Sequence, residues 1–352
     1  MVPVTTTHTV SATDDTVTVG RFEIEKSPVA TIDSGDWVSV ETRYHYNDGI
    51  VPGMDITAIA NLRRRFRGRG PHSVTGPIYV KGAEPGDVLE IRIRGIRLKS
   101  YGFNFNLPGE FMTGAIPEDF PTGHVKYFDL DGALMSTRFA PGVTVTLAPY
   151  PGILGVGPPL DWPEKWPVGL PRELGQPEAG SFSTVPPGPF GGNLDNTEWG
   201  VGAAVFLPVF HAGALVWTGD SHCKQGDGEV NLTAIECAFG PVTMQIIVRK
   251  DRRAEGAWAW PIAETRTHWI VQGLHTDLDE AVKHAVRNTI DFLVREKDFT
   301  RHDAYAFASV AVDYRITQVV DIVKGVHGMI PKAFFDDAGH FACTLCDRRF
   351  AW

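Results

Sequence analysis

The sequence lacks a hydrophobic run long enough to cross a membrane, and it has few cysteines. No stretch of about 18 consecutive apolar residues occurs among its 352 residues, so we expect no membrane partner. The 4 cysteines are too few for a disulfide scaffold and indicate a reducing compartment. The opening residues, MVPVTTTHTV, also lack the basic and apolar regions of a signal peptide. We therefore predict a cytoplasmic protein.

A surplus of positive charge is also missing. Lys and Arg total 33 against 42 Asp and Glu, and this balance of −9 argues against a nucleic-acid partner. No phosphate-binding loop, dinucleotide fingerprint or G-x-S-x-G motif is present. The arginines of residues 63–69 are a local exception. We interpret this segment as a solvated loop or a contact to another subunit, the alternative being an anion-binding patch.

Turn residues and alternating apolar residues predict a mainly β fold. The chain has 37 Gly and 25 Pro, which favour turns over long helices. Alternation is clearest in the run after the turn at residues 84–87, with Val88, Leu89, Ile91 and Ile93. A helical stripe occurs only late, between residues 278 and 293. We predict a β-sandwich or barrel-like body with a small α/β portion near the C-terminus.

The same features suggest a division of the chain. We expect a β-rich body over residues 1–264, an α/β portion packed on it over 265–335, and a C-terminal tail over 336–352. Residues 149–193 are rich in Pro and Gly, but Trp162 and Trp166 predict an ordered excursion of the body. We expect helix starts at Thr276 and at Thr300, each followed three residues later by Asp.

The densest group of reactive side chains follows the apolar run FHAGALVWT. It reads GDSHCKQGDGE, from Gly219 to Glu229. Asp220 and His222 share one face if the segment is extended, and a carboxylate beside an imidazole is a plausible half of a zinc site. Asp227 and Glu229 form a second acidic pair. The alternative interpretation is a tight turn whose Asp side chains bond the local backbone.

Two further candidates lie upstream. Asn193 and Asp195, in GGNLDN, share a face if extended; the alternative is an Asx-turn that leads into the next strand. His72 is a lone histidine, which is more often structural than functional. In the tail, Cys343-x-x-Cys346 is a single pair without a second one, and this is weak evidence for zinc.

At these residues the chain resembles the acetamidase/formamidase family. Five passages carry the resemblance, in order along the chain: IDSGDWVSVET, HSVTGPIYVKGAEPGDVLEIRI, GGNLD, LPVFHAGALVWTGDSHCKQGDGEV and DYRITQVVDIVKGVHGMIPK. The resemblance implies hydrolysis of a short carboxylic amide to acid and ammonia. It also implies a mostly β fold, a homo-oligomer (a dimer or higher), and a bound divalent metal, for which we favour zinc over calcium or another ion. Cys223-Lys224 and Asn231-Leu232 depart from the family pattern.

These expectations assign a role to each candidate. The metal ligands are expected among His72, Asp195, Asp220 and His222. Glu229 is the predicted general acid/base, with Asp227 as the second choice. The side chains expected to hold the amide or stabilise its oxyanion are Asn193 and Gln225, with Gly226 allowing a close backbone approach.

Three alternatives remain open at this point. Cys223 beside Lys224 is a candidate nucleophile of a nitrilase-like mechanism. The substrate of a metal hydrolase could instead be a lactam, whose ring opening releases no ammonia. The chain could also be a non-catalytic β-rich binding protein that keeps the fold.

Overall fold

The computed structural model describes residues 7–335, and these residues build two large sheets. The first sheet has nine strands in the spatial order β1 (Thr7–Val10), β5 (Trp37–Val40), β18 (Phe239–Arg249), β7 (Val88–Leu98), β15 (Ala204–Pro208), β19 (Ile262–Glu264), β20 (His268–His275), β22 (Lys324–Pro331) and β21 (Asp313–Gln318). Apart from the parallel pair at its β1 edge, its neighbouring strands run antiparallel.

The second sheet carries most of the polar clusters found in the sequence. Its order is β14 (Gly191–Asn193), β12 (Tyr150–Gly155), β16 (Val216–Lys224), β17 (Ile235–Cys237), β8 (Tyr101–Asn106) and β9 (His124–Asp129), while β6 (Ser73–Val80) pairs with β16 and also with β2 (Val17–Val19) and β4 (Ala30–Ile32). Two small ribbons complete the β structure: β10 (Ser136–Ala140) with β11 (Val143–Thr146), and β3 (Arg21–Glu23) with β13 (Ser181–Ser183).

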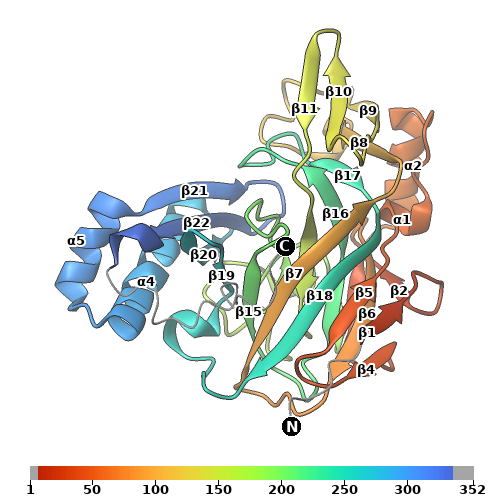
Figure 1. Cartoon of the computed structure of the whole chain (residues 1–352). Coiled ribbons are helices and arrows are strands. Elements are labelled where there is room, and N and C mark those ends of the chain that lie inside the picture. Colours follow the sequence, from red (N-terminus) through yellow and green to blue (C-terminus); the bar gives the residue numbers. More distant parts are fainter. Residues whose placement is uncertain (1–6, 336–352) are drawn as a thin grey trace.

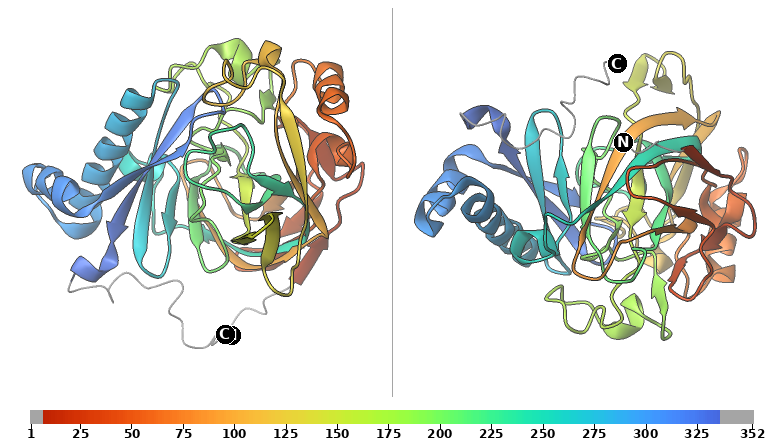
Figure 2. Two further views of the ribbon diagram at one scale, coloured as in Figure 1. Left: turned by 90° about the horizontal axis from the view of Figure 1, so that it is seen from above. Right: turned by 60° about the horizontal axis from the view of Figure 1, so that its bottom comes forward.

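Helices are few and lie outside the sheets. They are α1 (His45–Asp48), α2 (Ile56–Arg65), α3 (Arg172–Gly175), α4 (Leu278–Lys297) and α5 (Arg301–Ala311), with short 3₁₀ turns η1 (Gly109–Phe111), η2 (Gly256–Ala259) and η3 (Lys332–Phe334). The views in Figures 1 and 2 place α4 and α5 at one side of the molecule and α1 and α2 at the other. Among the described residues, no helix is both long and apolar enough to cross a membrane.

The main core lies between the two sheets. Val38 and Ile91 contribute to it from the first sheet, and Ile78, Leu154 and Trp217 contribute from the second, all with no exposed surface. Removing apolar surface from water is worth roughly 25 cal/mol per Å², so these inward faces supply the main stabilisation of the sandwich. The mainly β fold predicted from the alternation is confirmed.

The C-terminal helices cover one end of the first sheet. Helix α4 packs on β20 and β22, and Gly273 is needed there, because a Cβ would lie 2.2 Å from the amide nitrogen of Ala285. Strands β19 to β22 continue the sheet that begins with β1, while the proposed boundary at residue 264 stays a prediction. The tail over 336–352 lies outside the described residues.

Two local predictions need correction. The first late helix is capped by Asp277, whose carboxylate accepts the amide hydrogen of Glu280, and not by Thr276. The expected cap at Thr300 is confirmed. The arginine-rich segment is not wholly a loop, because it begins in the last turn of α2, a helix started by the Asp55 cap. Basic side chains at that end of a helix complement its dipole.

The Pro/Gly-rich excursion is ordered, as expected. It contains β12, α3, β13 and β14, and Trp162 within it is completely buried. The excursion places β12 beside β16, and β14 beside β12, and so completes one wall of the site.

Candidate metal centre and active site

Strand register aligns three functional side chains across the second sheet. In the antiparallel ladder, Tyr150 of β12 stands opposite His222 of β16, and His222 stands opposite Glu236 of β17. Directly opposed residues project to the same face of a sheet. His222 Nε2 lies 3.2 Å from Glu236 Oε2, and both side chains are buried. A cluster of ionisable side chains therefore lies in the middle of the sheet.

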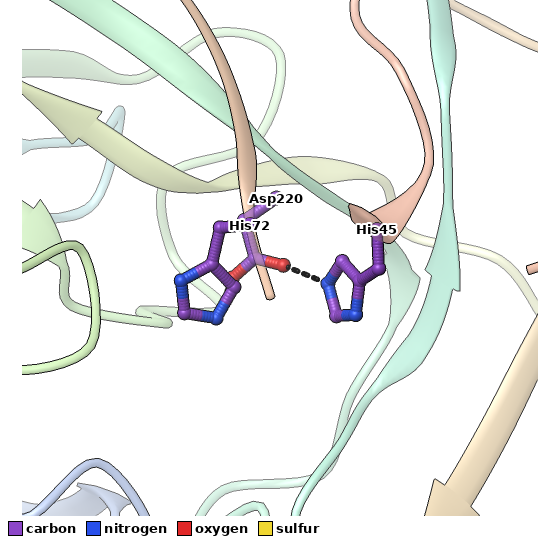
Figure 3. Close-up of side chains that lie close together, drawn as sticks. All are labelled: His45, His72 and Asp220. Atoms are coloured by element: carbon purple, nitrogen blue, oxygen red, sulfur yellow. Dashed lines mark hydrogen bonds and ion pairs between the residues drawn. The ribbon is translucent and has the colours of Figure 1, made fainter. Parts of the chain in front are cut away.

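Two more histidines converge on Asp220, next but one to His222 in β16 (Figure 3). His45 Nε2 is 2.7 Å from Asp220 Oδ1, and His72 Nε2 is 3.8 Å from Asp220 Oδ2. His45 comes from α1, a tight turn in which the next three residues have positive φ. His72 immediately precedes β6. Residues far apart in the sequence thus surround one carboxylate.

A second group of acids borders the first. Asp195 follows β14 and Glu229 lies in the loop between β16 and β17, and both offer oxygens to a three-residue group with His222. Asp321, from the β21–β22 loop, lines the same cavity as Asp195 and Glu229. The backbone of Gly152 allows the Asp195 side chain to lie close to it, because a Cβ on Gly152 would lie 2.5 Å from Asp195 Oδ1.

Three of these acids share an uncommon backbone conformation. Asp195, Asp220 and Glu229 have φ of 50°, 46° and 46°, in the left-handed region. Such conformations cost about 1–3 kcal/mol each and persist where the surrounding structure imposes them, often at functional sites. The backbone is held in the conformation that directs these carboxylates into one space.

Several donor atoms of the cluster are buried without a hydrogen bond. Within residues 7–335 this holds for His222 Nε2, Glu236 Oε2, Asp195 Oδ1 and Asp321 Oδ2. The atoms lie near one another, but their angles are not those of hydrogen bonds. Burying such groups is costly unless a partner compensates them, and imidazole and carboxylate are the ligands that divalent metals take. The donor set fits a divalent cation.

Charge divides the cluster into two halves, and the first half is ionised. Burial alone would lower the pKa of His45, but the carboxylates of Glu236 and Asp220 outweigh burial and raise it to about 9. The pKa of His222 is raised well above its usual value in the same way. Conversely, neighbouring histidines overcome the burial of Asp220 and Glu236 and hold their pKa values below the usual range.

The second half holds protons. Burial raises the pKa of Asp195 to about 7; the charge of His222 opposes this rise, while the charges of Asp220 and Glu236 add to it. Burial and the Asp195 charge raise the pKa of both Glu229 and Asp321 well above their usual values. A protonated carboxylic acid beside a charged centre is a general acid at neutral pH.

A hydrogen-bond chain fixes the orientation of His222. Gln225 Nε2 donates to the backbone carbonyl of Asp195 at 2.9 Å, which leaves Gln225 Oε1 to accept from the hydroxyl of Tyr150. Because that hydroxyl donates to Gln225, its oxygen accepts from His222 Nδ1, 3.1 Å away. The chain aims His222 Nε2 at Asp220 and Glu236, as supporting hydrogen bonds do for metal-ligating histidines.

The cluster opens into a cavity of about 380 Å³. All four predicted metal ligands belong to the cluster: His72, Asp195 and Asp220 line the cavity, and His222 lies 3.6 Å from Asp195 Oδ1 and 3.5 Å from Asp220 Oδ2. Glu229 also lines it.

The predicted substrate contacts do not all lie at this cavity. Asn193 lines it and donates to Val185, while its Oδ1 has no hydrogen-bond partner in the described part of the chain. Gln225 uses both ends of its amide inside the protein and lines a different depression, so its substrate contact stays a prediction. Gly226 and Asp227 line a different depression, and Asp227 accepts from Thr197.

Sequence reasoning missed four members of the site: His45, Glu236, Tyr150 and Asp321. None of them stands in a Gly-rich or acidic motif. Glu236 and Tyr150 enter only through strand register with His222, which the sequence does not display. A usable signal was present in HYND, because Asn and Asp after a histidine favour the left-handed turn that α1 adopts.

The candidate nucleophile lies elsewhere. Cys223 is fully buried, and its thiol donates to the carbonyl of Ile235 at 3.4 Å. It follows His222 in β16 and does not line the cavity, so a substrate there cannot reach it. Cys343 and Cys346 lie outside the described residues.

Known proteins are similar to this chain in sequence. A family model described as the Acetamidase/Formamidase family matches residues 5–173 and 171–337. An acetamidase of Mycolicibacterium smegmatis is 26% identical over 342 residues, covering 81% of this chain and 83% of that protein. A formamidase of Methylophilus methylotrophus is also 26% identical, over 316 residues, with coverages of 75% and 77%.

Solved structures of related proteins have a similar fold. The crystal structure of an acetamidase from Bacillus halodurans superposes with a TM-score of 0.78 at 29% identity, covering 94% of this chain and 99% of that one. A gamma lactamase from Delftia acidovorans shares the fold with a TM-score of 0.65 at 24% identity, covering 94% and 93%. The family match spans nearly the whole chain, and the chain therefore belongs to the acetamidase/formamidase family.

Proposed function

We propose that the protein hydrolyses a linear carboxylic amide to a carboxylic acid and ammonia, with a divalent metal bound at the cluster. The observation that carries the proposal is the pairing, at one cavity, of a buried donor set that fits a divalent cation, centred on Asp220, with a buried carboxyl group, that of Glu229. Amide hydrolysis needs both, because the carbonyl must be polarised and the leaving nitrogen must be protonated. The names of the acetamidase and formamidase relatives support the same reaction.

The metal ligands are proposed from the atoms already placed. His45, His72, His222, Asp220 and Glu236 offer imidazole nitrogens and carboxylate oxygens within one buried space. Nitrogen and carboxylate ligands suit zinc, which we propose as the metal. When bound, such an ion supplies Lewis-acid polarisation of a carbonyl oxygen and lowers the pKa of water.

The residues of the protonated half act on the nitrogen side of the reaction. Hydrolysis forms a C–O bond from water to the carbonyl carbon and breaks the C–N bond. We assign Glu229 as the general acid, because its buried carboxyl group holds a proton that the leaving nitrogen needs. The attacking water returns a proton to the same carboxylate. Asn193 is assigned to the substrate amide, since its Oδ1 has no partner among residues 7–335 and can accept an amide hydrogen.

The test combines metal analysis of the purified protein with ammonia release from formamide and acetamide. Bound divalent metal and ammonia release that is lost on chelation and restored by zinc are expected. Metal-free protein with full activity, or metal-replete protein inactive on every amide, would contradict the proposal. The fold shared with a gamma lactamase makes lactam opening a second candidate. A lactam in the same panel, followed by product mass because no ammonia leaves, separates the two reactions.

Replacing Cys223 decides between this mechanism and a thiol nucleophile. We expect Cys223→Ser to keep more than about a tenth of the activity, a barrier change below roughly 1.4 kcal/mol. The thiol is buried on a backbone carbonyl, and a hydroxyl can occupy the same place. Loss of nearly all ammonia release in a folded, metal-replete C223S variant would restore the cysteine mechanism. Cytoplasmic location and homo-oligomer formation stay predictions from the sequence.

A further inference from the structure

The cavity is much larger than the smallest amides require. Its volume of about 380 Å³ lies in the range of pockets that hold drug-sized ligands, about 300–1,000 Å³. Acetamide carries only a methyl group beyond its amide. Space remains after the amide has been placed at the cluster, and the walls of that space indicate what fills it.

Those walls are apolar and come from separate segments. Phe105 and Leu107 approach from the end of β8, Leu232 from the loop after Glu229, and Val319 and Val320 from the loop after β21. Phe105 and Leu107 are almost completely buried, with exposed fractions of 2% and 4%. The apolar wall begins directly at the metal cluster, since the rings of Phe105 and His45 lie 6.4 Å apart.

A tethered loop forms the rim on the same side. Phe111 and Met112, at the end of η1, line the cavity, and Met112 is 72% exposed. The loop is attached beside the proposed general acid, because the amide of Ala115 donates to the carbonyl of Val230 at 2.8 Å. An exposed methionine at the mouth of a pocket is a flexible apolar contact for a ligand.

The apolar wall offers no partner to a charged substrate tail. The five carboxyl groups that line the cavity belong to the cluster, as do His45 and His72. Two basic side chains, Arg63 and Lys324, also line the cavity, and the Arg63 guanidinium already donates to the carbonyl of Arg69 at 2.6 Å. An uncharged, apolar group is the best complement to the remaining wall.

We propose that the preferred substrate is a neutral primary amide whose acyl group is apolar and larger than acetyl, such as butyramide, hexanamide or phenylacetamide. The inference rests on the proposed amidase function and concerns which amide the same site selects. Burying one methylene is worth about 0.8 kcal/mol, so each added methylene that reaches the wall raises kcat/KM about fourfold.

The first experiment measures kcat/KM for ammonia release across formamide, acetamide, butyramide, hexanamide and phenylacetamide. A steady rise from acetamide to the larger amides is expected. A maximum at formamide or acetamide would overturn the inference while leaving the amidase function intact. Inactivity on the whole series would instead refute the amidase function. Faster hydrolysis of an equally long amide that ends in a carboxylate would assign the selectivity to Arg63 and Lys324 and overturn the apolar assignment.

Variants locate the selectivity. Val320→Phe narrows the cavity, and it should lower kcat/KM for hexanamide at least tenfold more than for acetamide. Val310→Phe is the matched control, because Val310 is 84% exposed on α5 and does not line the cavity. It should leave the ratio of the two rates unchanged.

Met112→Ser is a second variant at an exposed position, where the fold does not depend on the side chain. It should reduce the hexanamide-to-acetamide ratio severalfold. If both cavity variants keep the wild-type ratio, the wall does not select the acyl group.

Discussion

Two buried histidines in different regions of the protein, His45 and His327, differ in charge. In the cavity, carboxylates raise the pKa of His45 to about 9, although burial still lowers that of the neighbouring His72 to about 4. At the end covered by α4, His327 in β22 has no exposed surface, and burial lowers its pKa to about 4. Burial is common to both places, so the difference comes from the balance of charges: two carboxylates act on His45, whereas the single acid that acts on His327, Asp227, is opposed by Arg315. Carboxylates packed against a buried imidazole can outweigh burial, and where they do not, the histidine stays neutral.

The largest expected effect follows from removing the charge at the centre of the cavity. Asp220→Asn and His222→Ala should each lower metal content and reduce turnover about 10³-fold or more, because a bound metal contributes several kcal/mol. Metal analysis and ammonia release measure both effects. Asp227→Asn is the matched control in the same segment, since Asp227 lines a different depression. A D220N variant with wild-type metal content and turnover would show that the carboxylates of the cavity do not hold a metal.

The second-largest effect is expected from replacing Glu229, the proposed general acid. Glu229→Gln keeps the shape of the side chain but cannot release a proton, so turnover should fall about 10²-fold. Metal content and the thermal midpoint should stay close to wild type, because the ionised half is untouched. A stable and fully active E229Q variant would exclude Glu229 as the acid. Lower stability with retained activity would show that the residue only holds its loop.

A smaller effect is expected from the hydrogen-bond chain. Tyr150→Phe removes the acceptor for His222 Nδ1 and frees Gln225 Oε1, and losses at such supporting positions are typically about 10–100-fold in metal affinity. Competition with a chelator measures the affinity. Tyr127→Phe is the control, since its hydroxyl donates to the carbonyl of Met54, outside the cluster. Equal affinities in the two variants would show that Tyr150 does not orient His222.

The smallest effect concerns stability at the other end of the sheet. The pKa of His327 is about 4 in the folded chain and near 6.5 when unfolded, so the unfolded state binds more protons between these values. Its contribution to stability is present above about pH 6.5 and is lost as the pH falls toward 4. His327→Asn should therefore reduce the drop in unfolding free energy between pH 7 and pH 5, measured by denaturant titration. An unchanged drop would show that His327 does not stay neutral in the fold.

Local patterns in the sequence predicted much of the fold but only part of the site. The alternation of apolar residues over 88–96 is a local pattern of the sequence, and it predicted a buried strand correctly. The two-residue spacing of Asp220 and His222 likewise placed both in one charged cluster. In contrast, β16 is buried on both faces, so no polar–apolar alternation marks it as the central strand.

The rest depends on contacts between distant segments. His45 reaches Asp220 across 175 positions of sequence, and Glu236 meets His222 through strand register. The hydrogen-bond partners of Gln225 were not predictable for the same reason, because Tyr150 and Asp195 are brought to it by β12 and by the segment after β14. Spacing along the chain carries no information about such pairings.

One measurement tests the central claim most directly: zinc titration of chelator-stripped protein, with binding followed by calorimetry and ammonia release followed on the same samples. The account predicts saturable binding, amidase activity that rises in proportion to occupancy, and loss of both in the D220N variant. Full activity in stripped protein, or zinc binding that Asp220→Asn leaves unchanged, would contradict it.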